Sequence, residues 1–145
     1  MDDLESIYTD VIMEHSTATY NKHKLDGANC SEHGHNPSCG DDITIEVKMD
    51  GDKIADLAFT GHGCAISQAS TSIMVDLLKG KTKDEAIKLI KLFLKMTTRE
   101  KLTEEELDEL GEARALQNIA NMPARTKCAE LAWYTMEKLL SKKEE

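Results

Sequence analysis

The sequence predicts an α+β fold, in which a small antiparallel β-sheet of about three strands has helices packed against it. Two observations carry this prediction. Residues 43–49 and 53–60 alternate apolar and polar side chains around Asp50-Gly51, the pattern of two strands joined by a tight turn. From residue 65 onward, apolar side chains recur at helical spacing instead. A third short strand is expected around residues 28–33.

The first expected element is an amphipathic helix over residues 3–16, whose start is favoured by Asp2 and Glu5. Its inner face is formed by residues at helical spacing: Leu4, Ile7, Tyr8, Val11, Ile12 and His15. The stretch 17–41 that follows is rich in Asn, Gly, His and Ser, and is expected to be largely irregular. A loop of this length inside a compact domain is often functional.

Start and stop signals then delimit the helices of the second half. A helix over 65–79 is expected to end at Gly80, a C-cap residue. Capping-box patterns open two further helices, one at Thr82 to Glu85 and one at Thr103 to Glu106. A last helix is expected over 121–140, with Pro123 tolerated in its first turn. The length fits one domain over residues 1–145, and no internal repeat or linker interrupts it.

The composition narrows the classes of function. The net charge of −9, from 27 acidic against 18 basic side chains, argues against a nucleic-acid partner, which requires a basic face. No apolar run approaches the roughly 18 residues of a membrane helix, and the start MDDLESIY is too acidic for a signal peptide. We therefore expect a cytoplasmic protein whose four cysteines are reduced, as ligands, nucleophiles or core residues.

Three of the cysteines, at positions 39, 64 and 128, lie at expected element boundaries, although no pair has the C-x-x-C spacing of common zinc motifs. Cys39 precedes Gly40 and Asp41 at the exit of the long loop. Cys64 ends a Gly-His-Gly turn at the start of a helix, where backbone N–H groups and the helix dipole favour a thiolate.

Cys128 lies near the start of the last helix, beside the cations Arg125 and Lys127, which also favour a thiolate. A free cysteine is, however, commonly a small core residue, and Cys128 falls on the apolar stripe of this helix. Cys30 is interpreted as structural or incidental. No role is assigned to the loop histidines His33 and His35 or to the other histidines at 15, 23 and 62.

Four segments resemble the U-type iron–sulfur assembly family, which comprises IscU, SufU and the N-terminal part of NifU. They are Ile12-Met13-Glu14-His15, Asn36-Pro37-Ser38-Cys39-Gly40-Asp41, residues 59–70 with Gly61-His62-Gly63-Cys64-Ala65, and Pro123-Ala124-Arg125-Thr126-Lys127-Cys128-Ala129. They recur in family order over essentially the whole chain. The resemblance implies a SufE/NifU-like fold and one metal site, with Cys39, Asp41, Cys64 and Cys128 as ligands.

Departures from the family pattern favour its SufU branch. Scaffold-type IscU carries a His where this chain has Lys127, and a chaperone-recognition motif where this chain has residues 121–125. The segment 97–121 is similar to the insertion of SufU-type proteins. Residues 20–24 lack the Pro-Arg-Asn run of both branches, so the N-terminal match is the weakest.

The resemblance implies a zinc-dependent sulfurtransferase that accepts persulfide sulfur from a SufS-type cysteine desulfurase and works with downstream iron–sulfur assembly proteins. Three thiolates and one carboxylate suit Zn²⁺. Cys39, on its loop, is interpreted as the acceptor, and Arg125 either steadies the thiolate or is a solvated cation at the helix end. Two alternatives stay open: a scaffold for a transient [2Fe-2S] cluster that is passed to apo-proteins, and a purely structural zinc or thiol domain.

Overall fold

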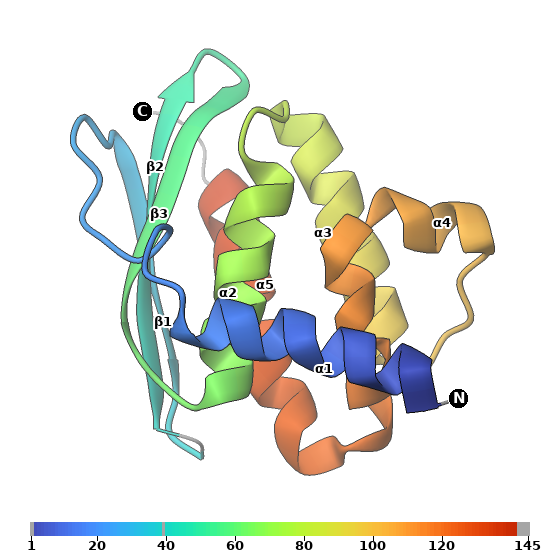
Figure 1. Ribbon diagram of the computed structural model, residues 1–145. Coiled ribbons are helices and arrows are strands. Elements are labelled where there is room, and N and C mark those ends of the chain that lie inside the picture. The colour runs from blue at the N-terminus through green and yellow to red at the C-terminus, as the bar shows by residue number, and fades with distance from the viewer. Residues whose placement is uncertain (1, 39, 142–145) are drawn as a thin grey trace.

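The computed structural model describes the backbone of residues 2–38 and 40–141, and side chains from residue 10 onward within these ranges. Its sheet has three antiparallel strands in the order β1 (Cys30–Asn36), β2 (Asp41–Asp50) and β3 (Lys53–His62). The helices are α1 (Asp2–Thr17), α2 (Ala65–Leu78), α3 (Lys83–Thr97), α4 (Glu104–Glu109), the 3₁₀ helix η1 (Gly111–Asn121) and α5 (Pro123–Ser141). Figure 1 shows the sheet on one side of the molecule, with the helices gathered on the other. The predicted α+β class and three-stranded sheet are confirmed.

The inner face of the sheet follows from the alternation in β2, where Ile43, Ile45 and Val47 are fully buried. Helices α2 and α5 pack against this face. Helix α5 approaches β1 so closely that a Cβ on Gly34 would lie 2.1 Å from the Thr135 Oγ1. Glycine at position 34 is therefore required by the contact between this helix and the edge strand.

The core between the helices is centred on Trp133 of α5, whose indole ring stacks on Phe93 of α3 at 3.9 Å between centroids. The Trp133 Nε1–H donates to the Ser70 Oγ at 2.8 Å, and the Ser70 hydroxyl donates to the Ala129 carbonyl at 2.6 Å. Ser70 thereby links the middle of α2 to α5 by buried hydrogen bonds.

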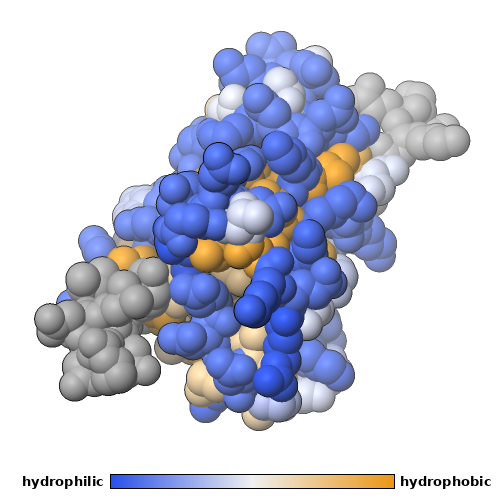
Figure 2. Space-filling view, turned by 90° about the vertical axis from the view of Figure 1, so that its right-hand side faces the viewer, coloured by the Kyte–Doolittle hydropathy of each residue, from blue (hydrophilic) through white to orange (hydrophobic). Residues whose placement is uncertain are grey.

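The helical side is largely hydrophilic, with apolar side chains visible between the charged ones (Figure 2). A cleft of about 500 Å³ lies where α3, the segment after it and η1 meet, and Met96, Leu102 and Leu107 contribute to its lining. Among the described residues, none of the helices is long and apolar enough to cross a membrane.

Most boundary signals in the sequence proved accurate. Both capping boxes form, at Thr82 with Glu85 and at Thr103 with Glu106, and Gly80 has the positive φ of +87° that suits the end of a helix. The last helix begins at Pro123 rather than at residue 121. The capping box at Thr103 opens only a short helix, which continues as the 3₁₀ segment η1, a change of geometry that the sequence did not predict.

The largest correction concerns the stretch 17–41, which was expected to be mainly irregular. Seven of its residues form β1, which extends beyond the strand expected at 28–33 and reaches Asn36. The strand is polar, with Ser31, His33 and His35 exposed, because it is the edge of the sheet. A strand of this kind has no apolar alternation by which periodicity could reveal it.

Candidate metal centre

Asp41 is the first residue of β2 and is fully buried. Its Oδ1 accepts a hydrogen bond from the backbone N–H of Cys64 at 3.0 Å. Its buried Oδ2 has no hydrogen-bond partner among the described residues. An ionised carboxylate oxygen left in this way is costly unless a cation neutralises it.

Two cysteines lie beside this carboxylate. Cys64 is the N-cap residue of α2 and is half-buried, whereas Cys128, in the second turn of α5, is only 1% exposed. One oxygen of Asp41 and the two sulfurs of Cys64 and Cys128 all lie within 4.8 Å of one another. The fold therefore gathers three of the four predicted ligands, one each from β2, the start of α2 and α5.

These residues fit a thiolate-ligated metal ion. Zinc bonds of about 2.0–2.3 Å in a tetrahedron place neighbouring ligand atoms roughly 3.3–3.8 Å apart, close to the spacing of at most 4.8 Å found here. The Cys128 sulfur is disulfide-bonded in this structure and would serve as a ligand only in its reduced form. Zinc and iron both bind such mixed sulfur and oxygen sets. Among the described residues, the buried Asp41 Oδ2 has no hydrogen-bond partner, and this observation is the strongest indication of a cation at this position.

The N-terminus of α2 provides the local electrostatics. Cys64 is the N-cap residue and so lies at the free N–H groups and the positive end of the helix dipole, and the first turn of α2 contains no acidic residue. Gly63 allows the close approach of the two chain segments, because a Cβ at that position would lie 2.5 Å from the Asp41 Oδ1.

Polar side chains around the centre were not singled out from the sequence. The Ser67 Oγ and both amide atoms of Gln68 are buried without hydrogen-bond partners among the described residues. The Ser67 Oγ would be 3.2 Å from a Cβ on Gly63, so it borders the same space as the Asp41 carboxylate.

The other predicted site residues are distributed as follows. Cys39, expected as ligand and acceptor, lies outside the described residues. Arg125 is exposed and precedes Cys128 by three positions, which places both on one side of α5. Cys30 pairs with Val47 at the far end of β1, six positions from Asn36 and thus roughly 20 Å away along the strand. Its interpretation as a residue outside the site agrees with this position.

Three histidines surround Asp42, the neighbour of Asp41. His33 hydrogen-bonds the Asp42 carboxylate through its Nε2 at 2.7 Å, while His35 and His62 stand opposite Asp42 on the adjacent strands. The hydrogen bond from His33 is the main cause that holds the pKa of the Asp42 carboxyl below 3.8. Asp42 is therefore already paired and is oriented differently from its buried neighbour.

Comparison with known proteins adds the family context. Residues 7–129 match the family described as the NifU-like N-terminal domain. The chain is 40% identical over 139 residues to the iron–sulfur cluster assembly scaffold protein IscU of Streptococcus pyogenes serotype M1, covering 96% of this chain and 86% of that protein. It is also 40% identical over 141 residues to the zinc-dependent sulfurtransferase SufU of Bacillus subtilis strain 168, covering 97% and 94%.

Solved structures share the fold. A crystal structure of FiSufU from Fervidobacterium islandicum AW-1, described as a candidate iron–sulfur cluster assembly scaffold for the SUF system, superposes with a TM-score of 0.87 at 39% identity and covers 94% of this chain and 98% of that one. An N-terminal NifU-like protein from Brucella abortus has the same fold, with a TM-score of 0.81 at 21% identity and 94% of both chains covered.

Proposed function

The chain belongs to the family of NifU-like N-terminal domains, the iron–sulfur cluster assembly proteins to which IscU and SufU also belong, and we propose that it acts there as a zinc-dependent sulfur acceptor for a SufS-type cysteine desulfurase. The observation that carries the proposal is the buried Asp41 carboxylate, whose Oδ2 has no hydrogen-bond partner in the described part of the chain and lies beside the sulfurs of Cys64 and Cys128. Cys39 is proposed as the fourth ligand. Bound there, zinc would keep the cysteine sulfurs as thiolates and act as a Lewis acid.

Cys39 is proposed as the residue that accepts sulfur. Its thiolate attacks the outer sulfur of the desulfurase persulfide, a new S–S bond forms on Cys39, and the desulfurase cysteine leaves as a thiolate. The exchange is balanced without an added oxidant or reductant. Cys64 and Cys128 belong to helices, whereas Gly40 beside Cys39 has a φ of +70° and no atom within 4 Å of its Cβ position. Gly40, the neighbour of the proposed acceptor in the sequence, is itself exposed.

Arg125 is proposed to assist by charge. It is exposed and lies three positions before Cys128 on the same helix. A guanidinium at this position stabilises a nearby thiolate or an acidic group of the partner. Arg125→Gln should weaken acceptance of sulfur while zinc stays bound.

Mapping of the transferred sulfur tests the proposal. After incubation with persulfidated desulfurase, the chain should carry an added mass of about 32 Da on Cys39, the nucleophile with access to the partner. Cys39→Ser should still compete with wild type for the desulfurase without accepting sulfur. Cys30→Ser is the matched control and should behave as wild type, because Cys30 lies at the far end of β1. Sulfur found on Cys64 or Cys128 with Cys39 bare would overturn the assignment.

A scaffold role is the second candidate, because relatives at 40% and 37% identity are named IscU scaffold proteins. Here the [2Fe-2S] cluster would be cargo, assembled on the cysteines and released through the more exchangeable oxygen of Asp41. Metal analysis with a visible absorption spectrum of freshly purified protein separates the two functions. Stoichiometric zinc without visible absorbance supports the sulfur acceptor, and a brown iron-containing protein supports the scaffold.

A further inference from the structure

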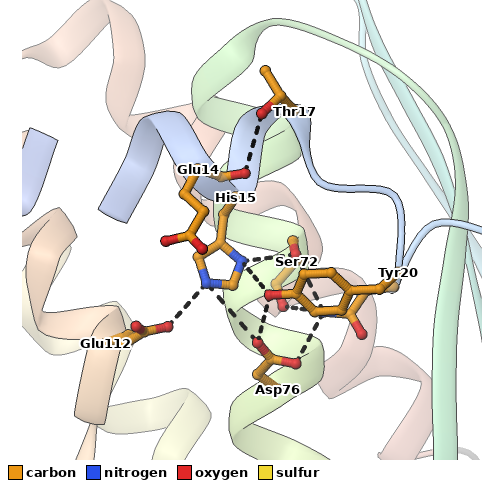
Figure 3. Close-up of polar contacts among 8 residues, drawn as sticks. Glu14, His15, Thr17, Tyr20, Ser72, Asp76 and Glu112 are labelled. Carbon is orange, nitrogen blue, oxygen red and sulfur yellow. Dashed lines mark hydrogen bonds and ion pairs between the residues drawn. The ribbon is translucent and has the colours of Figure 1, made fainter. Parts of the chain in front are cut away.

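A second cluster of possible ligands lies on the helical side, where the last turn of α1 meets α2 and η1 (Figure 3). His15 of α1 is only 3% exposed. Its Nδ1 lies 2.8 Å from the Ser72 Oγ of α2, and its Nε2 lies 2.9 Å from the Glu112 Oε1 of η1. The imidazole is thus fixed on one edge and directed toward a carboxylate on the other.

Asp76 of α2 is the second carboxylate beside His15, with its Oδ2 at 3.9 Å from the Nε2. Its position is also fixed. The Tyr20 hydroxyl donates to the Asp76 Oδ2 at 3.1 Å, and the Asn21 side-chain amide donates to the Oδ1 at 3.0 Å. The Asp76 and Glu112 side chains are 42% and 57% exposed, so the cluster combines a buried nitrogen with two carboxylates that solvent ions can reach.

We propose that His15, Asp76 and Glu112 form a second metal site, which binds one divalent first-row transition-metal ion. The possible ligand atoms, one from each residue, all lie within 4.8 Å of one another. Ligands on one such ion, with bonds of about 2.0–2.2 Å, are separated by roughly 3.0–3.6 Å. The distances from the His15 Nε2 to the Glu112 Oε1 and the Asp76 Oδ2, 2.9 and 3.9 Å, lie just below and just above this interval. This site shares no residue with the proposed sulfur-acceptor site.

Ser72 and Asn21 give the imidazole the partners that a metal ligand needs. In the metal-bound form, the Nδ1–H donates to the Ser72 Oγ, which leaves the Nε2 lone pair for the ion. The Ser72 Oγ has a second lone pair, which accepts from the Asn21 amide at 3.2 Å. A hydrogen bond on the remote ring nitrogen is the usual arrangement around a metal-bound histidine.

The charges at the site favour a divalent cation. The two carboxyl groups of Asp76 and Glu112 face a single imidazole, and the acidic side chain of Glu14 lies close by (Figure 3). The ligand set of one nitrogen and two oxygens, without a thiolate, is harder than that of the cysteine centre. Such a set suits Co²⁺, Fe²⁺, Mn²⁺ or Zn²⁺.

Cobalt titration of the full-length chain, first loaded with one equivalent of zinc, tests this site. We expect one further Co²⁺ per chain, visible by its weak d–d absorption and without the intense thiolate-to-cobalt band that Co²⁺ at cysteines would give. Glu112→Gln and Asp76→Asn should each weaken this binding at least tenfold, and His15→Gln should abolish it. Both carboxylates are partly exposed, so their variants are expected to fold.

His23→Gln is the matched control, because it removes an exposed imidazole that is not part of the cluster. It should bind the additional Co²⁺ as wild type does. The proposal is overturned if the zinc-loaded chain takes up no further Co²⁺, or if all bound Co²⁺ shows the thiolate band. It is also overturned if Glu112→Gln and Asp76→Asn bind Co²⁺ as tightly as wild type.

Discussion

The backbone N–H of Cys64 donates to the Oδ1 of Asp41 at 3.0 Å, and this bond ties the first residue of β2 to the N-cap of α2. It has two consequences. The carboxylate is held at the N-terminus of α2, where the positive end of the helix dipole lies. The Oδ2 is left directed away from that donor, buried and without a hydrogen-bond partner among the described residues. The position of the Asp41 carboxylate thus depends on this hydrogen bond from a main-chain N–H.

Asp41→Asn should lower zinc affinity at least tenfold while the fold is kept. The amide oxygen can still accept from the Cys64 N–H, but the anionic ligand is lost. Asp41→Ala should free the position altogether, so that the cysteines hold zinc weakly and a reconstituted cluster is released slowly. Competition with a chromophoric chelator measures the affinity. Asp42→Asn is the control, since Asp42 pairs with His33 instead. Equal affinities for wild type and both Asp41 variants would remove Asp41 from the ligand set.

Gly63→Ala should disturb the metal centre by a steric clash, without removing any proposed ligand. The new Cβ would lie 2.5 Å from the Asp41 Oδ1 and 3.1 Å from its Cγ, so the carboxylate has to move. We expect weaker zinc binding, by about tenfold, because a ligand is displaced from its position. Gly51→Ala, in the β2–β3 turn, meets no described atom within 4 Å but strains the backbone at its φ of +64°, so it serves as the control for strain at a glycine outside the metal centre. If both variants bound zinc as wild type does, the close approach at Gly63 would have no bearing on the metal centre.

Ser70→Ala should destabilise the fold by about 1–3 kcal/mol, because it leaves the buried Trp133 indole N–H without its acceptor. Chemical denaturation measures this loss. Thr71→Val is a suitable comparison, since the buried Thr71 hydroxyl donates to the Ser67 carbonyl of its own helix and leaves no unpaired donor when removed. A loss no larger than that of Thr71→Val would mean that the link between α2 and α5 contributes little.

Local signals in the sequence were sufficient for much of this fold. The hairpin around Asp50-Gly51 and both capping boxes depend on a few neighbouring residues, so they could be identified without tertiary information. The polar strand β1 could not, because its pairing with β2 and the contact of Gly34 with α5 decide its conformation. Tertiary context overrides local pattern in such segments.

In the candidate site, too, the features set by neighbouring residues were predictable from the sequence, and those set by tertiary contacts were not. The position of Cys64 at a helix start was readable from its own neighbours, whereas its proximity to Asp41 and Cys128 joins three separate elements. The ligand set came from the family resemblance, not from spacing. His15 was expected on the inner face of α1, and it is buried, but its partners Ser72 and Glu112 are polar and come from distant parts of the chain. No pattern in the sequence indicated that these residues would lie together.

Glu85→Gln should make the stability of the protein less sensitive to acid. The backbone N–H of Thr82 is the main cause that lowers the pKa of the Glu85 carboxyl below 4.5. A group whose pKa is lower in the folded state contributes stability above its unfolded pKa and loses it as the pH falls through the folded pKa. Wild type should therefore lose free energy of unfolding below about pH 4.5 more steeply than Glu85→Gln. Glu100→Gln, at an exposed position outside the helices, should retain the wild-type slope.

Removal of the metal should destabilise the whole fold, because one ion joins β2, the start of α2 and α5. A ligand that binds only the folded chain, at about a thousand times its Kd, adds about 4 kcal/mol to the free energy of unfolding. For a protein of this size, that corresponds to a fall of about 10 °C in the thermal midpoint when a strong chelator strips the zinc. Calorimetry with and without chelator, after metal analysis has confirmed the removal, measures the change. Asp41→Asn supplies the internal control: its midpoint should start lower and respond less to the chelator. A wild-type midpoint that stays the same after complete removal would show that the fold does not depend on the metal.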